Sequence, residues 1–240
     1  MTTRLIANGC SFTQGHSRSN GKSWVDFVPV QNKINLANGG AGNTYICQST
    51  LEFLESYGNP INDIVAVMWS GTSRIDVQVS QSWYNYVIDQ GKTGCNNGSN
   101  HWIHTGSSGT IPMFETLCKV KDNQTLCLES LYNFVLLDSY LKNKGYRYFF
   151  TSYANCWTQH NQYCETTKID PSIGYHCKNF AVYRNFDFSN WIFTNNQRDC
   201  LAEFAWTPDC DDLHPSEEMH AKYAYDFVNP LVQKIHMQRN

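Results

Sequence analysis

The sequence predicts an α/β fold, a three-layer sandwich built on a mostly parallel five-stranded sheet. Three observations predict it. Short, continuously apolar runs such as Ile64–Trp69 are typical of strands that are buried on both faces. Longer segments with apolar residues at the helical period lie between these runs, and Gly or Pro residues separate the two kinds of segment. The length of 240 residues is compatible with one domain, expected to span residues 1–240.

The first third of the chain contains three expected strands and two expected helices. In order they are the strand Arg4–Asn8, the short helix Trp24–Val28, the strand Lys33–Ala37, the helix Thr44–Tyr57 and the strand Ile64–Trp69. Pro29 and Gly58 follow the two helices, as residues that end helices do.

The rest of the chain continues the alternation with two interruptions. An irregular insertion rich in Gly, Ser, Asn and aromatic residues is expected at about 78–119, and a second one at 154–208. Between them lie a helix, Asn123–Asn143, and a buried strand, Tyr146–Tyr153. A final helix is expected to have Pro215 in its first turn. In such a sheet, ligands bind beyond the carboxyl ends of the strands.

Composition excludes several classes of function. The net charge is −3 with scattered basic residues, so a nucleic-acid partner is not expected. No apolar run is long enough to span a membrane and no signal peptide is recognisable, which predicts a soluble, cytoplasmic or virion-associated chain. The ten cysteines form no C-x-x-C pair and are expected to be reduced packing residues. The oligomeric state is left open.

No cofactor and no metal are expected. The glycine-rich segment lacks both the phosphate-binding and the dinucleotide-binding patterns. A zinc site could be drawn from two histidines and two cysteines, but their spacing matches no common zinc pattern. These residues are His160, Cys164, His176 and Cys177.

Four polar segments carry candidate chemistry. Three follow successive expected strands, so they should converge: GCSFTQG (9–15), NGGAGNT (38–44) and WSGTSR (69–74). The fourth, DDLHP, precedes the last helix. A serine hydroxyl needs a base, and a histidine base needs a carboxylate that fixes its tautomer. Ser11 and His214 are the expected nucleophile and base, with Asp211 or its neighbour Asp212 as the carboxylate.

The four segments together resemble the SGNH (GDSL-like) hydrolases. That family has G-D-S-x-T-x-G near its start, a G-x-T loop, and D-x-x-H near its end. The residues that fit these patterns are Gly9, Ser11, Thr13, Gly15, Gly42, Thr44, Asp211 and His214. The resemblance implies a flavodoxin-like three-layer fold and a triad of Ser11, His214 and Asp211. Asp212 is then a carboxylate beside a helix N-terminus.

The resemblance also implies an oxyanion hole, and here the sequence departs from the family. The expected donors are the backbone N–H groups of Ser11 and Gly42 and an asparagine amide in a G-x-N-D block. Thr72 stands where that asparagine belongs, or Ser73 if the register shifts by one residue. Cys10 replaces the aspartate of the first block. We interpret Cys10 as a packing residue and assign the third oxyanion donor to Thr72.

The third segment resembles a W-(S/T)-x-x-x-R variant found in SGNH-like proteins of tailed phages. It contains Trp69 and Arg74 at the matching positions, and we assign Arg74 to substrate binding. The aromatic residues of the first insertion have two interpretations, stacking on sugar rings or packing in a small core of their own. They are Trp83, Tyr84, Tyr86 and Trp102.

Two functions from different classes follow. The first is a serine esterase that hydrolyses acyl esters through an acyl-enzyme, acting on a small-molecule or carbohydrate ester, with carbohydrate O-acetyl groups as one candidate. The alternative is a catalytically weak or inactive glycan-binding or virion-associated module on the same scaffold. The intact Ser, His and Asp favour the enzyme, whereas Thr72 and Cys10 favour the module.

Overall fold

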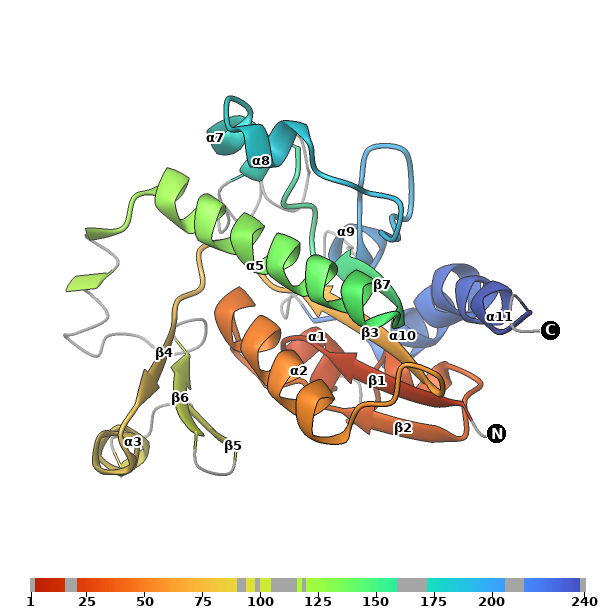
Figure 1. Cartoon of the computed structure of the whole chain (residues 1–240), viewed down its shortest axis with the longest axis horizontal. Helices are drawn as coiled ribbons and strands as arrows, with labels where there is room; N and C mark the ends of the chain where they lie inside the picture. The colour runs from red at the N-terminus through yellow and green to blue at the C-terminus, as the bar shows by residue number, and fades with distance from the viewer. Residues whose placement is uncertain are drawn as a thin grey trace.

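The computed structural model describes residues 3–15, 21–89, 94–97, 100–104, 116–117, 120–158, 172–205 and 214–237. Its central sheet has four parallel strands in the order β2-β1-β3-β7 (Figure 1). The strands are β1 (Arg4–Asn8), β2 (Asn32–Asn35), β3 (Asp63–Trp69) and β7 (Arg147–Ser152). The predicted α/β fold with a parallel sheet between helices is therefore confirmed.

The fifth sheet position is occupied by a short extended segment. Trp191 forms a parallel bridge with Phe150 of β7. The Phe150 N–H donates to the Asn190 carbonyl at 2.7 Å, and the Ile192 N–H donates to the Phe150 carbonyl at 2.8 Å. A regular fifth strand was expected, but the described part of the chain has this single bridge there.

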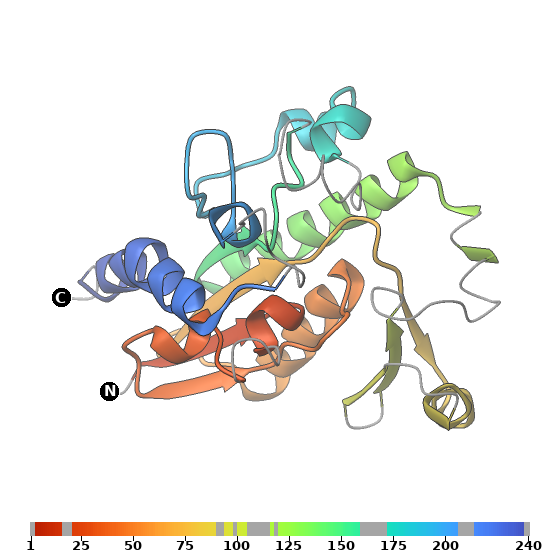
Figure 2. The same cartoon turned by 180° about the vertical axis from the view of Figure 1, so that it is seen from behind.

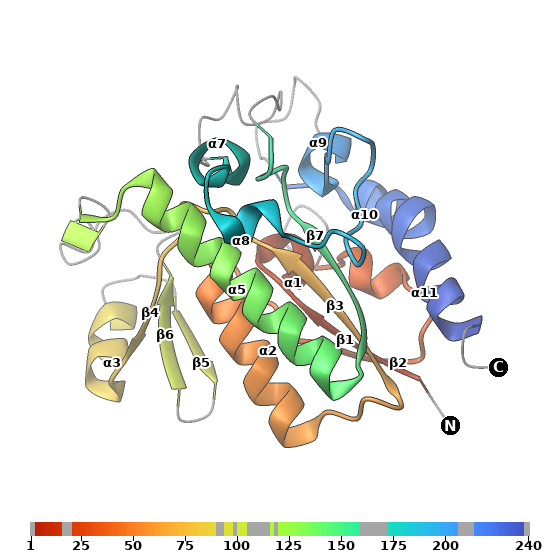
Figure 3. The same cartoon turned by 45° about the horizontal axis from the view of Figure 1, so that its top comes forward.

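Helices cover both faces of the sheet, as Figure 3 shows. One face packs against α2 (Asn43–Tyr57) and α5 (Asn123–Lys144). The other packs against the short helix η2 (Trp24–Phe27) and the C-terminal helical segments. Those segments are α10 (Glu217–Tyr223), the π-helical turn η3 (Ala224–Val228) and α11 (Asn229–Met237).

Side chains of β3 alternate between these two cores. Val65, Val67 and Trp69 contribute to the core under α2 and α5, and the intervening residues contribute to the other core. All seven residues of β3 are buried, as expected for a central strand of a parallel sheet. Both chain ends lie at the end of the sheet where the strands begin (Figure 2). The polar segments 9–15 and 69–74 follow the carboxyl ends of β1 and β3, at the opposite end.

The C-terminal helix begins two residues later than predicted. Ser216 is its N-cap, because the Ser216 side chain accepts a hydrogen bond from the Met219 N–H at 3.3 Å. Pro215 therefore lies just before the helix and not in its first turn. Capping by a serine side chain satisfies an N–H group that the first turn would otherwise leave without a partner.

The first insertion folds into a small subdomain of its own (Figure 1). It contains β4 (Asp76–Val79), α3 (Gln81–Asp89), β5 (Gly94–Asn97) and β6 (Asn100–His104), with the strands antiparallel in the order β4-β6-β5. The prediction of an irregular segment was wrong here. Strands such as GCNN lack the apolar alternation by which a strand is recognised in a sequence.

The described part of the second insertion contains three short helices. They are α7 (Ile173–Cys177), α8 (Ala181–Arg184) and α9 (Leu201–Ala205). A cluster of aromatic rings links this region to the sheet. Trp157, which follows β7, packs edge-on against Phe188 and Trp191, with ring centroids 4.7 and 5.0 Å away. This aromatic packing adds to the backbone hydrogen bonds between the region and β7.

Glu203 on α9 should make stability fall as pH rises. Its carboxylate accepts hydrogen bonds from the N–H groups of Asn155 and Cys200, yet burial raises the pKa of Glu203 to about 7. Because this pKa is above the ordinary value for glutamate, the folded state holds the proton more tightly than the unfolded chain does. The melting temperature should therefore fall between about pH 5 and pH 8. Thermal unfolding of wild type and Glu203→Gln tests this, since the variant should show a weaker pH dependence.

Candidate active site

The nucleophile segment turns sharply at the carboxyl end of β1. Gly9 is required there, because a Cβ atom would lie 2.4 Å from Thr13 Oγ1 and 2.8 Å from the Met68 carbonyl oxygen. Asn8 fixes the turn from the other side: its Oδ1 accepts from the Gly9 N–H, and its Nδ2 donates to the Ile46 carbonyl of α2. Ser11 then begins the four-residue helix α1 (Ser11–Gln14).

Ser11 and His214 lie within hydrogen-bond distance of each other. The Ser11 Oγ is 2.7 Å from the His214 Nε2, although the two residues are 203 positions apart in sequence. The Phe12 ring lies 5.0 Å from the imidazole ring, centroid to centroid, and packs against it. Ser11 is 8% exposed, which leaves part of its surface accessible. A hydroxyl at this distance can give its proton to the unprotonated Nε2 of a neutral imidazole.

The third member of the predicted triad falls outside the described residues. Asp211 lies in the segment 206–213, together with its rival Asp212. The assignment of the carboxylate therefore stays a prediction. The described residues include the expected nucleophile Ser11 and the expected base His214, which lie side by side.

His220 of α10 is a buried neighbour of the site. It is 1% exposed, and burial lowers the pKa of His220 to about 4, with a smaller contribution from the charge of His214. At neutral pH His220 is therefore an uncharged packing residue. Because His220 becomes protonated only near pH 4, it places no positive charge beside His214 at neutral pH.

The Gly42 N–H, expected to be an oxyanion donor, is engaged by a carboxylate. Asp76 Oδ1 accepts a hydrogen bond from Gly42 N–H at 2.8 Å, and Asp76 Oδ2 accepts from Tyr45 N–H at 2.8 Å. Asp76 thus caps the N-terminus of α2, where a negative charge is favourable. The role expected for Gly42 is corrected accordingly, because an N–H that points at a carboxylate is not directed at the nucleophile.

Asp76 is a site-adjacent residue that sequence reasoning missed. Its Oδ1 also lies 2.8 Å from His104 Nδ1, and both side chains are fully buried. Asp76 and His104 are directly paired across β4 and β6, at the base of the insertion. The same carboxylate therefore joins the insertion to the glycine-rich loop. No local pattern reveals this, since the partners lie 28 residues or more from Asp76.

Two residues of the third block, Arg74 and Thr72, were assigned roles at the site. Arg74 Nη1 donates to the Ala41 carbonyl at 3.2 Å, and its guanidinium lies 5.5 Å from the centroid of the Tyr153 ring. Tyr153 in turn packs edge-on against Phe12, at 5.1 Å. Thr72 is 1% exposed and lies in the loop after β3. Burial on this scale is compatible with a constrained hydroxyl, and its role as a donor stays a prediction.

Asn43 is not available as an alternative donor. Its Nδ2 donates to the Ser70 carbonyl at 3.2 Å and to Ser130 Oγ at 3.0 Å. Its Oδ1 accepts from the Ser70 N–H at 2.8 Å. The amide therefore ties the start of α2 to the end of β3 and to α5, and it uses both of its donor hydrogens in doing so.

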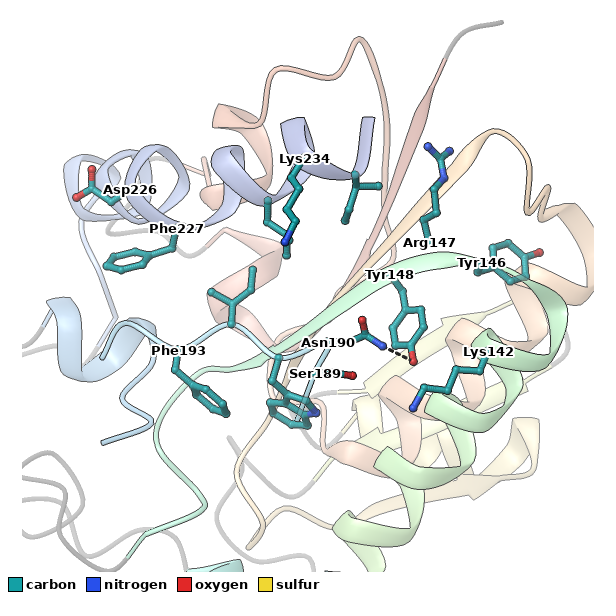
Figure 4. Close-up of a pocket in the computed structure, with 14 residues that line it drawn as sticks. Lys142, Tyr146, Arg147, Tyr148, Ser189, Asn190, Phe193, Asp226, Phe227 and Lys234 are labelled. Carbon is teal, nitrogen blue, oxygen red and sulfur yellow. Dashed lines mark hydrogen bonds between the residues drawn. The ribbon is translucent and has the colours of Figure 1, made fainter. Parts of the chain in front are cut away.

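A groove of the described structure lies away from these residues. Its volume is about 730 Å³, and it is lined by Tyr148 and Lys234 among others (Figure 4). Arg147 and Tyr148 stand at the amino end of β7. Because ligands of such sheets bind at the carboxyl ends of the strands, this groove is not the candidate active site.

The cysteines were expected to be reduced packing residues. The six cysteines whose side chains are described are buried thiols that form no disulfide: Cys10, Cys47, Cys127, Cys156, Cys177 and Cys200. Cys10 packs in the same core as Phe12 and Tyr153.

Two members of the rejected zinc constellation, His160 and Cys164, lie outside the described residues. Among the described helices, none is long and apolar enough to cross a membrane.

Comparisons with known proteins give structural likenesses only. No protein family and no curated protein matches the sequence. The chain is similar to a lipase from a goat rumen metagenome, at 12% identity and a TM-score of 0.47, covering 93% of this chain and 95% of the other. It is also similar to a candidate acylhydrolase from Bacteroides fragilis, at 14% identity and a TM-score of 0.43, covering 99% and 88%.

A third similar structure is a GDSL-like lipase from Bacteroides thetaiotaomicron, at 14% identity and a TM-score of 0.43, covering 98% of this chain and 89% of the other. Likeness at these identities and TM-scores does not establish family membership or activity. The functional assignment therefore depends on the site itself.

Proposed function

We propose that the protein is a serine ester hydrolase of the SGNH type with Ser11 as nucleophile. The observation that carries the proposal is the 2.7 Å contact between Ser11 Oγ and His214 Nε2. It joins a serine at the carboxyl end of a central strand to a histidine near the other end of the chain. This pairing of nucleophile and base is the minimum that serine-based acyl transfer requires.

In the proposed reaction, His214 takes the hydroxyl proton as Ser11 Oγ attacks the ester carbonyl carbon. The resulting tetrahedral intermediate expels the alcohol, which receives that proton from His214, and leaves Ser11 acylated. Water, deprotonated by His214, then attacks the acyl carbon. As the bond between that carbon and Ser11 Oγ breaks, His214 returns the proton to Ser11 Oγ and the acid is released. Asp211 is the proposed partner of His214 Nδ1, where it would fix the tautomer and stabilise the imidazolium.

The proposed oxyanion donors are the Ser11 N–H and the Thr72 hydroxyl. Gly42 is not included, because its N–H donates to Asp76. A backbone N–H at the start of a helix is fixed before the reaction begins, as an oxyanion donor must be. Thr72 is buried and follows β3, whose carboxyl end lies beside that of β1 in the sheet.

Replacement of Thr72 by valine tests the second donor. The change removes the hydroxyl at nearly constant shape, so kcat should fall roughly tenfold to a thousandfold with little change in KM. Steady-state kinetics with a short acyl ester measures both constants. A variant that keeps the wild-type kcat would remove Thr72 from the oxyanion hole.

The proposed substrate is a small-molecule or carbohydrate ester, with O-acetyl groups on a carbohydrate as the first candidate. Arg74 is the proposed substrate contact, since its guanidinium is held in place by the Ala41 carbonyl and the Tyr153 ring. Phe12 packs against both the Tyr153 ring and the His214 ring. The Arg74 guanidinium is therefore linked to the proposed base through two packed aromatic rings.

One observation favours the alternative of a binding module with little turnover. With Gly42 N–H held by Asp76, the site has fewer backbone donors than the resemblance implied. Loss of one such donor costs on the order of 3 kcal/mol of transition-state stabilisation in serine hydrolases. A protein of this kind would retain the Ser11–His214 contact and yet hydrolyse esters slowly.

Labelling with a fluorophosphonate separates the two functions. The reagent reacts with activated serines, so an esterase should be labelled stoichiometrically at Ser11. Ser11→Ala should abolish labelling, and Ser152→Ala, which changes a buried serine of β7 outside the proposed site, should leave the Ser11 adduct in place. Failure of the wild-type protein to react would favour the binding module.

A further inference from the structure

The helix α3 presents one face to the insertion sheet and the opposite face to solvent. On the inner face, Val87 is 1% exposed and packs with Ile103 of β6, and the Tyr84 ring lies 5.2 Å from the His101 ring. On the outer face, Trp83 is 46% exposed and Tyr86 is 56% exposed. Residues three apart on a helix lie on the same side, so the two outer rings are neighbours.

The two outer rings form a defined pair. Their centroids are 5.7 Å apart, and their planes meet at 81° in an edge-to-face contact. Such contacts stabilise aromatic pairs in a fixed arrangement. Trp83 and Tyr86 thus form an exposed aromatic platform on α3. Large exposed aromatic groups on a folded surface mark interaction sites more often than scattered aliphatic residues do.

The polar groups that flank Trp83 and Tyr86 on α3 are amides and hydroxyls, and one acidic residue, Asp89, ends the helix three residues after Tyr86. Gln81 Nε2 donates to Asn85 Oδ1 at 2.8 Å, and Ser82 Oγ lies 3.1 Å from Ser80 Oγ. From Ser80 to Ile88 the chain has no Asp, Glu, Lys or Arg. A nucleic acid or an anionic membrane needs basic residues, which this helix lacks. A neutral, hydroxyl-rich ligand matches the absence of basic residues, because the amide, hydroxyl and carboxylate groups of this helix can all hydrogen-bond to hydroxyl groups.

The insertion connects this helix to the candidate active site. The small sheet lies between α3 and α2 in Figures 1 and 3. Its other face packs against α2 through Trp102, whose ring lies 5.7 Å from the Tyr45 ring. Asp76 at its base is bound to the Gly42 N–H. A ligand on α3 is therefore held on a subdomain that is joined directly to the glycine-rich loop.

We propose that the outer face of α3 is a binding platform for a neutral saccharide, on which Trp83 and Tyr86 stack against the apolar faces of sugar rings. Gln81, Ser82 and Asn85 supply hydrogen bonds to ring hydroxyl groups. The identification of this saccharide as the alcohol part of the ester substrate rests on the proposed function. The platform itself does not.

Affinity electrophoresis in native gels that contain xylan, glucomannan, dextran or hydroxyethyl cellulose tests the platform. The Ser11→Ala protein is used as background, so that no ester is cleaved. At least one polysaccharide should retard it. The double change Trp83→Ala and Tyr86→Ala should weaken binding roughly twofold to tenfold for each ring lost. Trp83→Tyr, which keeps a ring, should retain most of the retardation.

A matched control is available in Tyr57, which is 69% exposed at the end of α2, on the main domain. Tyr57→Ala should leave the retardation unchanged. The proposal is overturned if none of the four polysaccharides retards the protein, or if the double variant is retarded as strongly as its parent. Binding to phosphatidylcholine vesicles that depends on Trp83 and Tyr86, without retardation by any polysaccharide, would replace the saccharide with a lipid surface.

The two proposals fail independently. Gel retardation without fluorophosphonate labelling at Ser11 would leave the platform standing and remove the esterase. Labelling without retardation would leave the esterase and remove the platform.

Discussion

Replacement of Ser11 by alanine is expected to abolish hydrolysis of a short acyl ester while leaving the melting temperature within a few degrees of wild type. Alanine fits the nearly buried space that Ser11 occupies at the start of α1, so the fold should be kept. The change removes the hydroxyl that lies within hydrogen-bond distance of His214. His214→Ala should be equally damaging, because a nucleophile and its base act as a unit and either loss removes the same step. Steady-state rates and thermal unfolding of both variants measure the effect.

The carboxylate can be assigned in the same experiment. Asp211→Asn should lower kcat strongly, whereas Asp212→Asn serves as the control and should have a mild effect. A larger loss from Asp212→Asn would transfer the role to that residue. Wild-type rates in Ser11→Ala would mean that the chemistry lies elsewhere in the molecule.

Replacement of Asp76 by alanine is expected to destabilise the protein by about 3 kcal/mol or more. The change leaves the Gly42 and Tyr45 N–H groups without their acceptor and removes the partner of a fully buried histidine, His104. Chemical denaturation of wild type and variant measures the difference in the free energy of unfolding.

Asp122 offers a matched comparison for this prediction. It is also an aspartate at a helix N-terminus, where its Oδ1 accepts from the Thr125 N–H of α5, but it lies in an exposed setting. Asp122→Ala should cost clearly less than Asp76→Ala, since only an exposed N-cap hydrogen bond is lost. If Asp76→Ala is no more costly than Asp122→Ala, the insertion is not anchored through Asp76.

The sequence predicted those elements whose physical signal is local. The strands β1, β3 and β7 are apolar runs buried in the sheet, and their predicted bounds agree with the structure to within two residues at each end. The strand β2 begins one residue before its predicted start and ends two residues before its predicted end, because it is a polar edge strand with little apolar pattern.

Features that depend on distant partners could not be predicted in the same way. The engagement of Gly42 by Asp76 requires knowledge that β4 begins beside the N-terminus of α2. The antiparallel strands β5 and β6 have polar sequences that a single-sequence pattern does not distinguish from a loop. By contrast, Ser11 and His214 could be paired across 203 residues, because each lies in a motif with a chemical role.

The direct pairing of Asp76 with His104 has a consequence for how this protein can change. Paired residues of antiparallel strands have Cα atoms only about 5 Å apart, so β4 begins and β6 ends at adjacent points. The segment between these points, with the proposed saccharide platform on α3, can therefore be exchanged as a unit, provided that the two residues at its base and the packing of Trp102 on Tyr45 are kept.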